Sequence, residues 1–211
     1  MARPKYHHGN LRAELIDVAG TIVAESGLSA LSVAAAAKRT GVTAAAPYRH
    51  FSGRLALLTA VAAEAARQFD AEARAALPTE RDDDPVGWAI EAMASTAATY
   101  VRFVVRRRIG WDVIFGDELK GVLDQDRLAA ARSLSDTYLD PARVVTGGDV
   151  RAALTLVEHE IATAHGYATL YTAGLFARRY PDVERAARKA ASITRTLATA
   201  AAGPEWAAAQ K

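Results

Sequence analysis

The segment from Gly41 to Leu58 gathers residue types that can hold a phosphate backbone. Tyr48, Arg49 and His50 follow one another, and Arg54 comes shortly after them. Phenol, guanidinium and imidazole groups donate hydrogen bonds to phosphate oxygens, and such contacts fix the position of a protein on DNA. These residue types can therefore contact phosphate groups.

The same segment predicts two short helices separated by a glycine turn. Residues 31–40 favour a helix with Ser32 at its N-cap, and Thr43 is suited to cap a second helix. Gly41 can adopt the positive φ that the turn between them requires. Pro47 would lie at the end of the first turn of the second helix, where most N–H groups lack an intrahelical partner. Helix, turn and helix form the unit that lays its second helix in the major groove of DNA.

Residues 41–58 resemble the DNA-binding headpiece of the TetR family of transcriptional repressors. The family pattern runs Gly-Val-Ser-x-Gly-x-Leu-Tyr-x-His-Phe, then a Lys, then Leu-Leu, and this chain matches it at Gly41, Val42, Tyr48, His50, Phe51, Leu57 and Leu58. Thr43 and Arg54 replace the usual Ser and Lys with chemically equivalent residues, whereas Ala45 and Pro47 depart from the usual Gly and Leu.

The resemblance implies a role for each matched position. The residues that would contact phosphate are Ser32, Thr43, Tyr48, His50 and Arg54, the last together with the N-terminal amides of its helix. Phe51 is expected in the core, where it would pack this segment onto the first helix. The alternatives are a core position for the Tyr48 ring and a buried structural role for His50.

The expected base-reading surface consists of alanines, namely Ala34, Ala44, Ala45 and Ala46. Alanine cannot hydrogen-bond a base edge and can only contact a thymine methyl or let the backbone approach closely. Polar readout would come from Arg49, or from an N-terminal arm with Arg3 and Lys5 in an adjacent groove, and DNA shape would supply the rest. The alternative for the arm is a disordered tail.

Composition narrows the class of protein. The 211 residues include no Cys and no long uncharged apolar run, so we expect no disulfide, no membrane span and a cytoplasmic location. Residues 1–54 carry seven Lys/Arg against three Asp/Glu, which places a basic head on a slightly acidic body. Without paired carboxylates, a phosphate loop or a nucleophile motif, we expect neither enzyme activity nor a cofactor.

Abundant alanine and apolar residues at spacings of three and four predict an all-α chain. We expect a helix-turn-helix domain at 1–54 and a ligand-binding and dimerisation domain at 55–211, and the resemblance implies about nine helices in all. Asn10 is expected to cap the first helix, and Gly27 to end it. The later helices are expected at 52–77, 85–108, 122–138, 149–178 and 181–201.

The body is expected to bind a small-molecule effector. Glycines interrupt the aromatic segment 109–116, which is more typical of a flexible pocket wall than of a packed helix. Candidate pocket residues are Trp88, Met93, Tyr100, Phe103, Trp111, Phe115, His165 and Tyr167, and the alternative is that most of them are plain core.

Residues 163–166, Thr-Ala-His-Gly, are similar to a Trp-His-Gly element in the regulatory domain of one TetR subgroup, with Ala164 in place of Trp. The nearby His159, Glu160 and His165 do not predict a zinc site. A zincin helix needs two His four residues apart, whereas these two are six apart and lie on different sides of a helix. We therefore expect no metal.

The helix expected at 149–178 has apolar residues on two faces, which predicts burial both in its own domain and against a partner. In the TetR family the last two helices form a four-helix interface with their symmetry mates. In this chain that interface would include Val157, Ile161, Ala164, Ala168, Ile193 and Leu197. The alternative is burial within a single chain.

These patterns together predict a homodimeric repressor of transcription. Its two recognition helices would enter successive major grooves of a near-palindromic operator in double-stranded DNA, about 34–36 Å apart. A largely apolar effector in the body would release the DNA. The alternatives are a helical small-molecule-binding protein and an architectural DNA-binding protein without effector-controlled repression.

Overall fold

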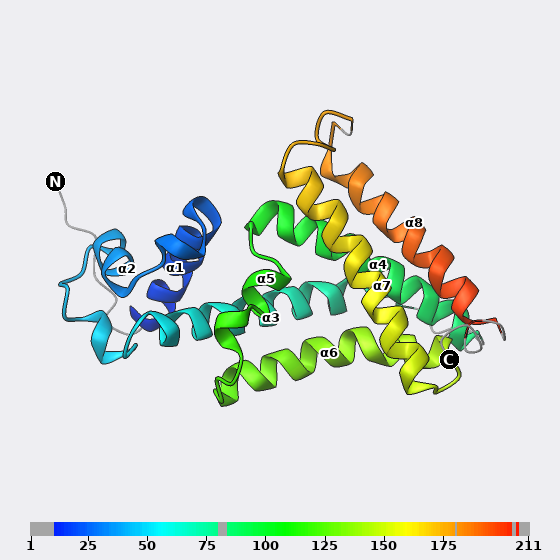
Figure 1. Cartoon of the computed structure of the whole chain (residues 1–211), viewed down its shortest axis with the longest axis horizontal. Helices are drawn as coiled ribbons and strands as arrows, with labels where there is room; N and C mark the ends of the chain where they lie inside the picture. Colours follow the sequence, from blue (N-terminus) through cyan, green and yellow to red (C-terminus); the bar gives the residue numbers. More distant parts are fainter. Residues whose placement is uncertain (1–10, 80–83, 180, 204–205, 207–211) are drawn as a thin grey trace.

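The chain is helical throughout the part that the computed structural model describes, which is residues 11–79, 84–179, 181–203 and 206 (Figure 1). These residues contain no strand, so the all-α prediction is confirmed. None of the described helices is long and apolar enough to cross a membrane. The elements are α1 (Leu11–Ser26), η1 (Leu28–Ala30), α2 (Val33–Thr40), η2 (Pro47–Arg49), α3 (Arg54–Ala75), α4 (Pro85–Arg107), α5 (Trp111–Ile114), η3 (Asp117–Leu119), α6 (Gln125–Val145), α7 (Val150–Thr172) and α8 (Val183–Ala201), where η marks a 3₁₀ helix.

The first elements form a small head at one end of the molecule (Figure 1). Ser32 caps α2 as predicted, because its side-chain oxygen accepts a hydrogen bond from the N–H of Ala35 at 3.0 Å. Gly41 ends the same helix in the left-handed conformation, with φ of 76°. Phe51 is only 3% exposed and packs in the head core, so its assignment to the core is confirmed. The predicted cap at Asn10 lies outside the described residues.

The segment predicted as the second DNA-binding helix is not an α-helix. After Gly41 the chain turns, and the N–H of Ala46 donates to the carbonyl of Thr43 at 3.0 Å before η2 begins. Pro47 explains the difference, because it has no N–H to donate to that carbonyl and the tighter three-residue bond takes its place. The Thr43 side chain makes no cap hydrogen bond to any described residue, so the predicted cap is wrong as well.

The long helix α3 joins the head to the body. It packs on α1 in the head and on α6 in the body, while α4, α7 and α8 pack on one another (Figure 1). A buried polar link fixes α3 to α6, since the Asp70 carboxylate accepts hydrogen bonds from the hydroxyls of Thr137 at 2.5 Å and Ser133 at 2.6 Å. Arg74 adds an ion pair to the same carboxylate at 3.1 Å. The head and the body are therefore built on one continuous helix.

Two predicted helix ends are wrong. Helix α6 does not stop before Pro141 but continues to Val145, and we attribute this to burial of Ala142 and Val145 in a core that includes α4, α7 and α8. Helix α7 stops at Thr172, well before the predicted end, because Gly174 takes a φ of +85° and leaves the helix. Asp149 and Asp182 cap α7 and α8 by accepting backbone hydrogen bonds, close to the predicted starts of these helices.

Candidate nucleic-acid interface and effector site

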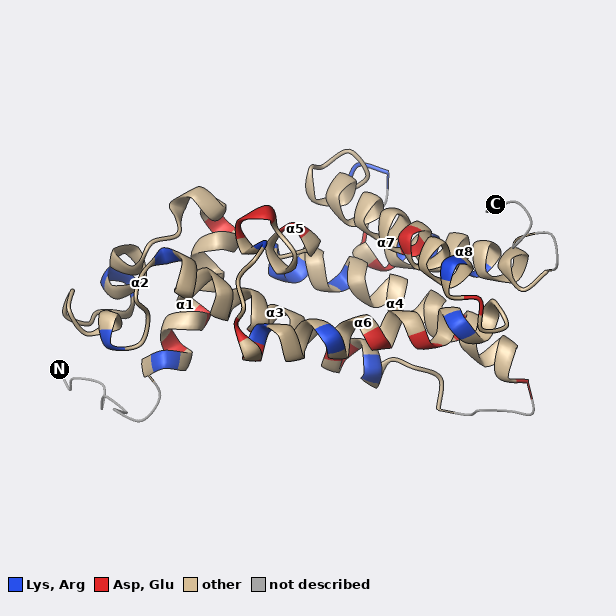
Figure 2. Cartoon of the chain, turned by 60° about the horizontal axis from the view of Figure 1, so that its bottom comes forward, with Lys and Arg blue, Asp and Glu red and all other residues tan. Residues whose placement is uncertain are grey.

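The tip of the head presents the polar side chains that the sequence singles out. Tyr48 is 56% exposed, and Arg49 and His50 beside it are exposed as well. The core alternatives for Tyr48 and His50 are therefore not observed. Figure 2 shows Lys and Arg on α2, on the turn after it and at the start of α1, all at the head end of the molecule. Cations and hydroxyls that point outward in this way are suited to phosphate contacts.

Alanine forms the surface between these polar groups. Ala34, Ala44 and Ala45 are exposed and Ala46 is half-buried, whereas Pro47 is buried beneath them. Such a surface offers no hydrogen-bond donor or acceptor of its own to a base edge, so Arg49 is its main polar group. The arm residues Arg3 and Lys5 lie outside the described part of the chain.

Arg54 differs from its predicted role as a phosphate contact. Its Nε donates to the carbonyl of Leu31 at 3.1 Å, and its Nη2 donates to the carbonyl of Leu28 at 2.9 Å. The guanidinium also forms an ion pair with Glu118 of η3, and this hydrogen bonding holds the pKa of the Glu118 carboxyl below its ordinary value. Arg54 thus fastens two head carbonyls to the body instead of facing outward, and the expected phosphate role is corrected.

Glu118 is a residue that sequence reasoning missed. It lies 64 residues from Arg54 in the chain, in a charged turn that shows no pattern of its own. The head has a second such pair, because Arg39 at the end of α2 binds Glu25 of α1 at 2.6 Å. Contacts of this kind depend on the tertiary fold and leave no periodic signal in the sequence.

The body holds a stack of aromatic rings where the glycine-broken segment crosses it. Trp111 stacks on Tyr100, with ring centroids 5.4 Å apart, and Phe115 stacks on the other side of Trp111 at 5.1 Å. Phe69 and Tyr138 meet the Trp111 ring edge-on from α3 and α6. The half-exposed end of this stack is Phe115, whose side chain is 41% exposed.

A hydrogen-bond network continues the stack toward α7. The Tyr100 hydroxyl accepts from the backbone N–H of Trp111 at 3.0 Å and lies 2.9 Å from Nδ1 of His165. Burial raises the pKa of Tyr100, so its hydroxyl stays protonated. The tautomer of His165 sets which of the two groups donates the hydrogen bond. Gly110 is required beside this network, because a Cβ there would lie 2.8 Å from the Tyr100 hydroxyl.

The candidate pocket residues do not share one cavity. Met93, Tyr100 and Phe103 are at most 1% exposed and belong to the core. Trp88 lies near the N-terminal end of α4, where its indole N–H donates to the carbonyl of Pro78 at 3.0 Å. These candidate residues therefore lie in several separate parts of the body and do not form one pocket.

Two of the candidates do meet at a hollow beside the stack. Trp111 and His165 line a cavity of about 420 Å³ together with the α7 residues Leu154, Val157, Glu158, Ile161 and Ala162. Phe115 adjoins this hollow through its stack on Trp111. Tyr167 is half-buried and contacts Phe176 instead, with ring centroids 5.4 Å apart.

Buried polar groups without a hydrogen bond lie near the aromatic stack. Among the described residues, the Trp111 indole nitrogen, the Tyr138 hydroxyl and both Glu160 carboxylate oxygens have no partner. Burial raises the pKa of the Glu160 carboxyl well above its ordinary value, so a neutral acid is favoured there. Such groups cost stability when they stay unpaired, and they offer hydrogen bonds to a ligand that reaches them.

The predicted dimer residues fall on two sides of the last helices. Ala164 and Ala168 are fully buried within the chain, in the same core as the α8 alanines, so they cannot face a partner. Their short side chains let α7 and α8 approach closely, which covers them. Val157, Ile161 and Leu197 are only partly buried, and Ile193 is 40% exposed. Leu154, which was not in the predicted set, is 55% exposed on the outer face of α7.

Comparison with known proteins agrees with the head geometry. Residues 15–61 match the model for the family described as bacterial regulatory proteins, tetR family. No curated protein matches the chain.

Solved structures extend the likeness to the whole chain. A protein of unknown function from Rhodococcus sp. RHA1 is 25% identical, covers 92% of this chain and 98% of its own, and superposes with a TM-score of 0.68. A TetR-like transcriptional regulator from the same organism is 15% identical over 89% of this chain and 92% of its own, with a TM-score of 0.61. The multidrug binding protein EbrR, solved with imidazole, is 20% identical over 87% of this chain and 93% of its own, with a TM-score of 0.53.

The family match covers the segment that carries the exposed Tyr48, Arg49 and His50, and the structural likeness continues through the helical body behind it. The head of this protein therefore matches the tetR family of bacterial regulatory proteins, whose members are DNA-binding transcriptional regulators and not enzymes, and the whole chain has the fold of a TetR-like regulator.

Proposed function

We propose that the protein is a homodimeric repressor that leaves a near-palindromic operator when a largely apolar effector binds its body. The proposal rests above all on the exposed surface of Tyr48, Arg49 and His50 within the family-matched head. Ser32, Thr43 and the N-terminal arm with Arg3 and Lys5 would add phosphate contacts, and Ala34 and Ala44–Ala46 would lie against the bases.

The route from the effector to the DNA follows from the residues that join body to head. The hollow is lined by α7 and by Trp111 at the start of α5, and η3 with Glu118 follows α5 in the chain. Glu118 binds Arg54, and Arg54 holds the carbonyls of Leu28 and Leu31 beside α2. A ligand that shifts α5 would therefore move the anchor of the head and change the spacing of two heads in a dimer, so that ligand and DNA oppose each other.

The nature of the effector follows from the lining of the hollow. Leu154, Val157 and Ile161 supply apolar surface, and the Trp111 and His165 rings line the rest of the hollow. A largely apolar molecule fits this lining. EbrR, which has a similar fold, is a multidrug binding protein, and this likeness supports a small-molecule ligand for the body of the present chain.

Dimerisation is supported by the outer surface of the last two helices. Leu154 and Ile193 are exposed, and Val157 and Ile161 lie half-buried next to Leu154 on α7. An apolar row on a helix that is already packed on its inner side is stabilised by a second partner. We infer that a second copy of the chain covers this row, so that the hollow lined by Leu154, Val157 and Ile161 would lie at the dimer interface.

Binding to genomic DNA at several salt concentrations tests the function. The purified protein is mixed with genomic fragments, and the bound fragments are recovered and measured by gel shift. A regulator binds a few fragments much more tightly than the rest, whereas an architectural protein binds all of them alike, and both lose affinity as salt rises. A small-molecule-binding protein without DNA function would retain no fragment, which would contradict the proposal.

A further inference from the structure

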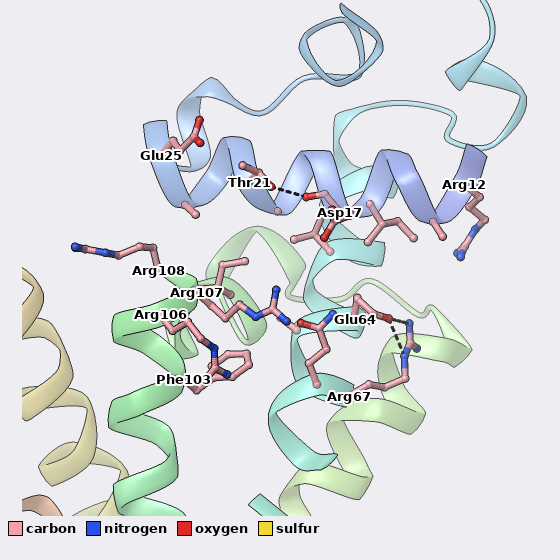
Figure 3. A pocket seen from close by; sticks show the side chains of 18 residues that line it. Arg12, Asp17, Thr21, Glu25, Glu64, Arg67, Phe103, Arg106, Arg107 and Arg108 are labelled. Atoms are coloured by element: carbon pink, nitrogen blue, oxygen red, sulfur yellow. Dashed lines mark hydrogen bonds and ion pairs between the residues drawn. The ribbon is translucent and has the colours of Figure 1, made fainter. Parts of the chain in front are cut away.

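A second cavity lies between the head and the body, away from the hollow beside Trp111. It has a volume of about 620 Å³, within the range of small-molecule sites, and α1, α3 and the end of α4 enclose it. Figure 3 shows α1 crossing above the cavity, with α3 and the end of α4 below. Nothing in the proposed repressor mechanism uses this cleft.

The rim of the cleft carries an excess of positive charge. Five arginines line it against three carboxylates, namely Arg12, Arg67, Arg106, Arg107 and Arg108 against Asp17, Glu25 and Glu64. Several of these charged side chains already have an ion-pair partner. Arg67 binds Glu64 of the same rim at 2.9 Å, Arg106 binds Glu72 at 2.5 Å, and Glu25 binds Arg39. The charges left to meet a ligand are therefore mainly positive.

Arg107 is the cation best placed for a ligand. It is exposed, and it forms no hydrogen bond or ion pair with any residue that the structure describes. In Figure 3 its side chain extends from α4 into the space between α1 and α3, whereas Arg108 points away from that space. Arg108 instead reaches the carbonyl of Thr172 at the end of α7.

The floor of the cleft is apolar. Ile16 of α1, Val61 of α3 and Phe103 of α4 line it, and all three are at most 6% exposed. Gly20 opens the α1 wall, because its missing side chain leaves room beside Ile109. A Cβ at Gly20 would lie 3.7 Å from the Ile109 side chain, which is an ordinary contact, so larger side chains there would extend into the cavity.

We propose that this cleft binds an amphipathic organic anion, with its apolar part on the floor and its carboxylate or phosphate group on Arg107. Guanidinium groups pair well with both kinds of anion, and the apolar floor excludes a bare inorganic ion. The ligand would join α1 of the head to α4 of the body. Under the proposed function, such a bridge restrains the head and changes DNA affinity, which adds a second site of control.

Isothermal titration calorimetry on the full chain without DNA tests the binding step. The probes are octanoate and octyl phosphate, with inorganic phosphate and 1-octanol for comparison. We expect one or both amphipathic anions to bind, and their ratio tells which head group the cleft prefers. Inorganic phosphate and octanol should bind at least about tenfold more weakly, because each lacks half of the interaction. Equal binding of octanol and octanoate would overturn the proposal.

Two pairs of variants place the ligand in the cleft. Arg107→Gln should weaken anion binding about tenfold or more, whereas Arg132→Gln, at an exposed arginine of α6, should not. Gly20→Leu should block anion binding by filling the cavity, whereas Gly20→Ala should leave most of the anion binding intact. Leucine and alanine both favour a helix over glycine, so both variants should fold, and circular dichroism checks this.

The outcomes separate this site from the proposed effector site. Phe115→Ala alters the hollow near α5 and should leave anion affinity unchanged. If Phe115→Ala abolishes anion binding while Arg107→Gln does not, the anion binds in the body and the cleft assignment is wrong. Because the readout needs no DNA, the cleft can be confirmed even if the repressor proposal fails. Anion binding that leaves DNA affinity unchanged would overturn only the regulatory role.

Discussion

The head and the body place their polar and apolar side chains in opposite ways. At the tip of the head Tyr48, Arg49 and His50 point outward, and the core behind them is apolar. In the body Tyr138 and Glu160 are buried, while Leu154 lies exposed on the outer face. Hence the surface of the head suits a charged partner, whereas the outer face of the body suits an apolar partner. The interior of the body holds polar groups that a bound molecule could pair with.

This difference indicates where each kind of partner binds. Exposed hydroxyl, imidazole and guanidinium groups can contact a phosphate without any rearrangement of the core behind them. Buried groups without partners carry an unfavourable free energy that a ligand or a proton can relieve. Substitutions in the body should therefore change assembly and stability, whereas substitutions at the tip of the head should change DNA affinity alone.

The largest effect is expected from charge on the outer apolar row. Leu154→Arg with Ile161→Arg should convert a dimer into monomers, because two guanidinium groups would be buried without partners at the interface. Multi-angle light scattering gives the mass directly. Ala129→Arg, at an exposed position of α6, serves as the control and should leave the mass unchanged. A dimer mass for the double variant would mean that the copies meet elsewhere.

The buried acid should make stability depend on pH. The pKa of Glu160 is raised in the folded chain, so folding takes up a proton between the unfolded and folded pKa values. Stability is thus greatest below the unfolded pKa and falls by about 1.4 kcal/mol per pH unit as pH rises through that window. Glu160→Gln should remove this fall and be more stable at neutral pH, as measured by urea unfolding at pH 4–8. Parallel pH curves for both proteins would show that Glu160 has a partner.

Substitutions of a core ring and of a surface ring of the aromatic stack should differ in their cost to stability. Phe115→Ala should cost about 1 kcal/mol of unfolding free energy, because Phe115 is 41% exposed and its main contact is the stack on Trp111. Phe69→Ala, at a fully buried ring, should cost about 3–5 kcal/mol. Guanidinium unfolding measures both, and neither variant that still folds should lose DNA affinity. Equal costs would place Phe115 in the core and remove it from the effector site.

The smallest effect on stability is expected at the exposed link between head and body. Glu118→Gln should leave the unfolding free energy nearly unchanged, yet hydrogen exchange should quicken in η1 and the start of α2. Because the pKa of Glu118 is lowered by Arg54, the link is present above its ordinary pKa and is lost as pH falls through the folded value. Asp117→Asn, which removes only a pair with Lys120, is the control and should leave exchange unchanged.

Local patterns predicted local structure well. The cap at Ser32 and the turn at Gly41 each follow from one residue and its immediate neighbours, and the structure has both. Pro47 shows the limit, because the family resemblance favoured a helix where the missing N–H leaves a turn and a 3₁₀ helix.

Contacts between distant segments could not be predicted. The ion pair of Arg54 with Glu118 and the network of Tyr100 with His165 join residues more than sixty positions apart, and neither pair lies in a periodic pattern. Helix periodicity also placed Ala164 on the outer face of α7, where a small side chain in fact lets α8 cover it. Which apolar residues face a pocket, a core or a partner depends on such packing.

The central claim is that the exposed tip of the head binds DNA through phosphate contacts. Fluorescence anisotropy with labelled duplexes of an operator and of an unrelated sequence, measured for the wild type and Tyr48→Ala at several salt concentrations, tests it most directly. We expect Tyr48→Ala to weaken binding to both duplexes by a similar factor, roughly tenfold, with an unchanged dependence on salt because the phenol carries no charge. Unchanged affinity of Tyr48→Ala for both duplexes would contradict the assignment of this surface as the DNA interface.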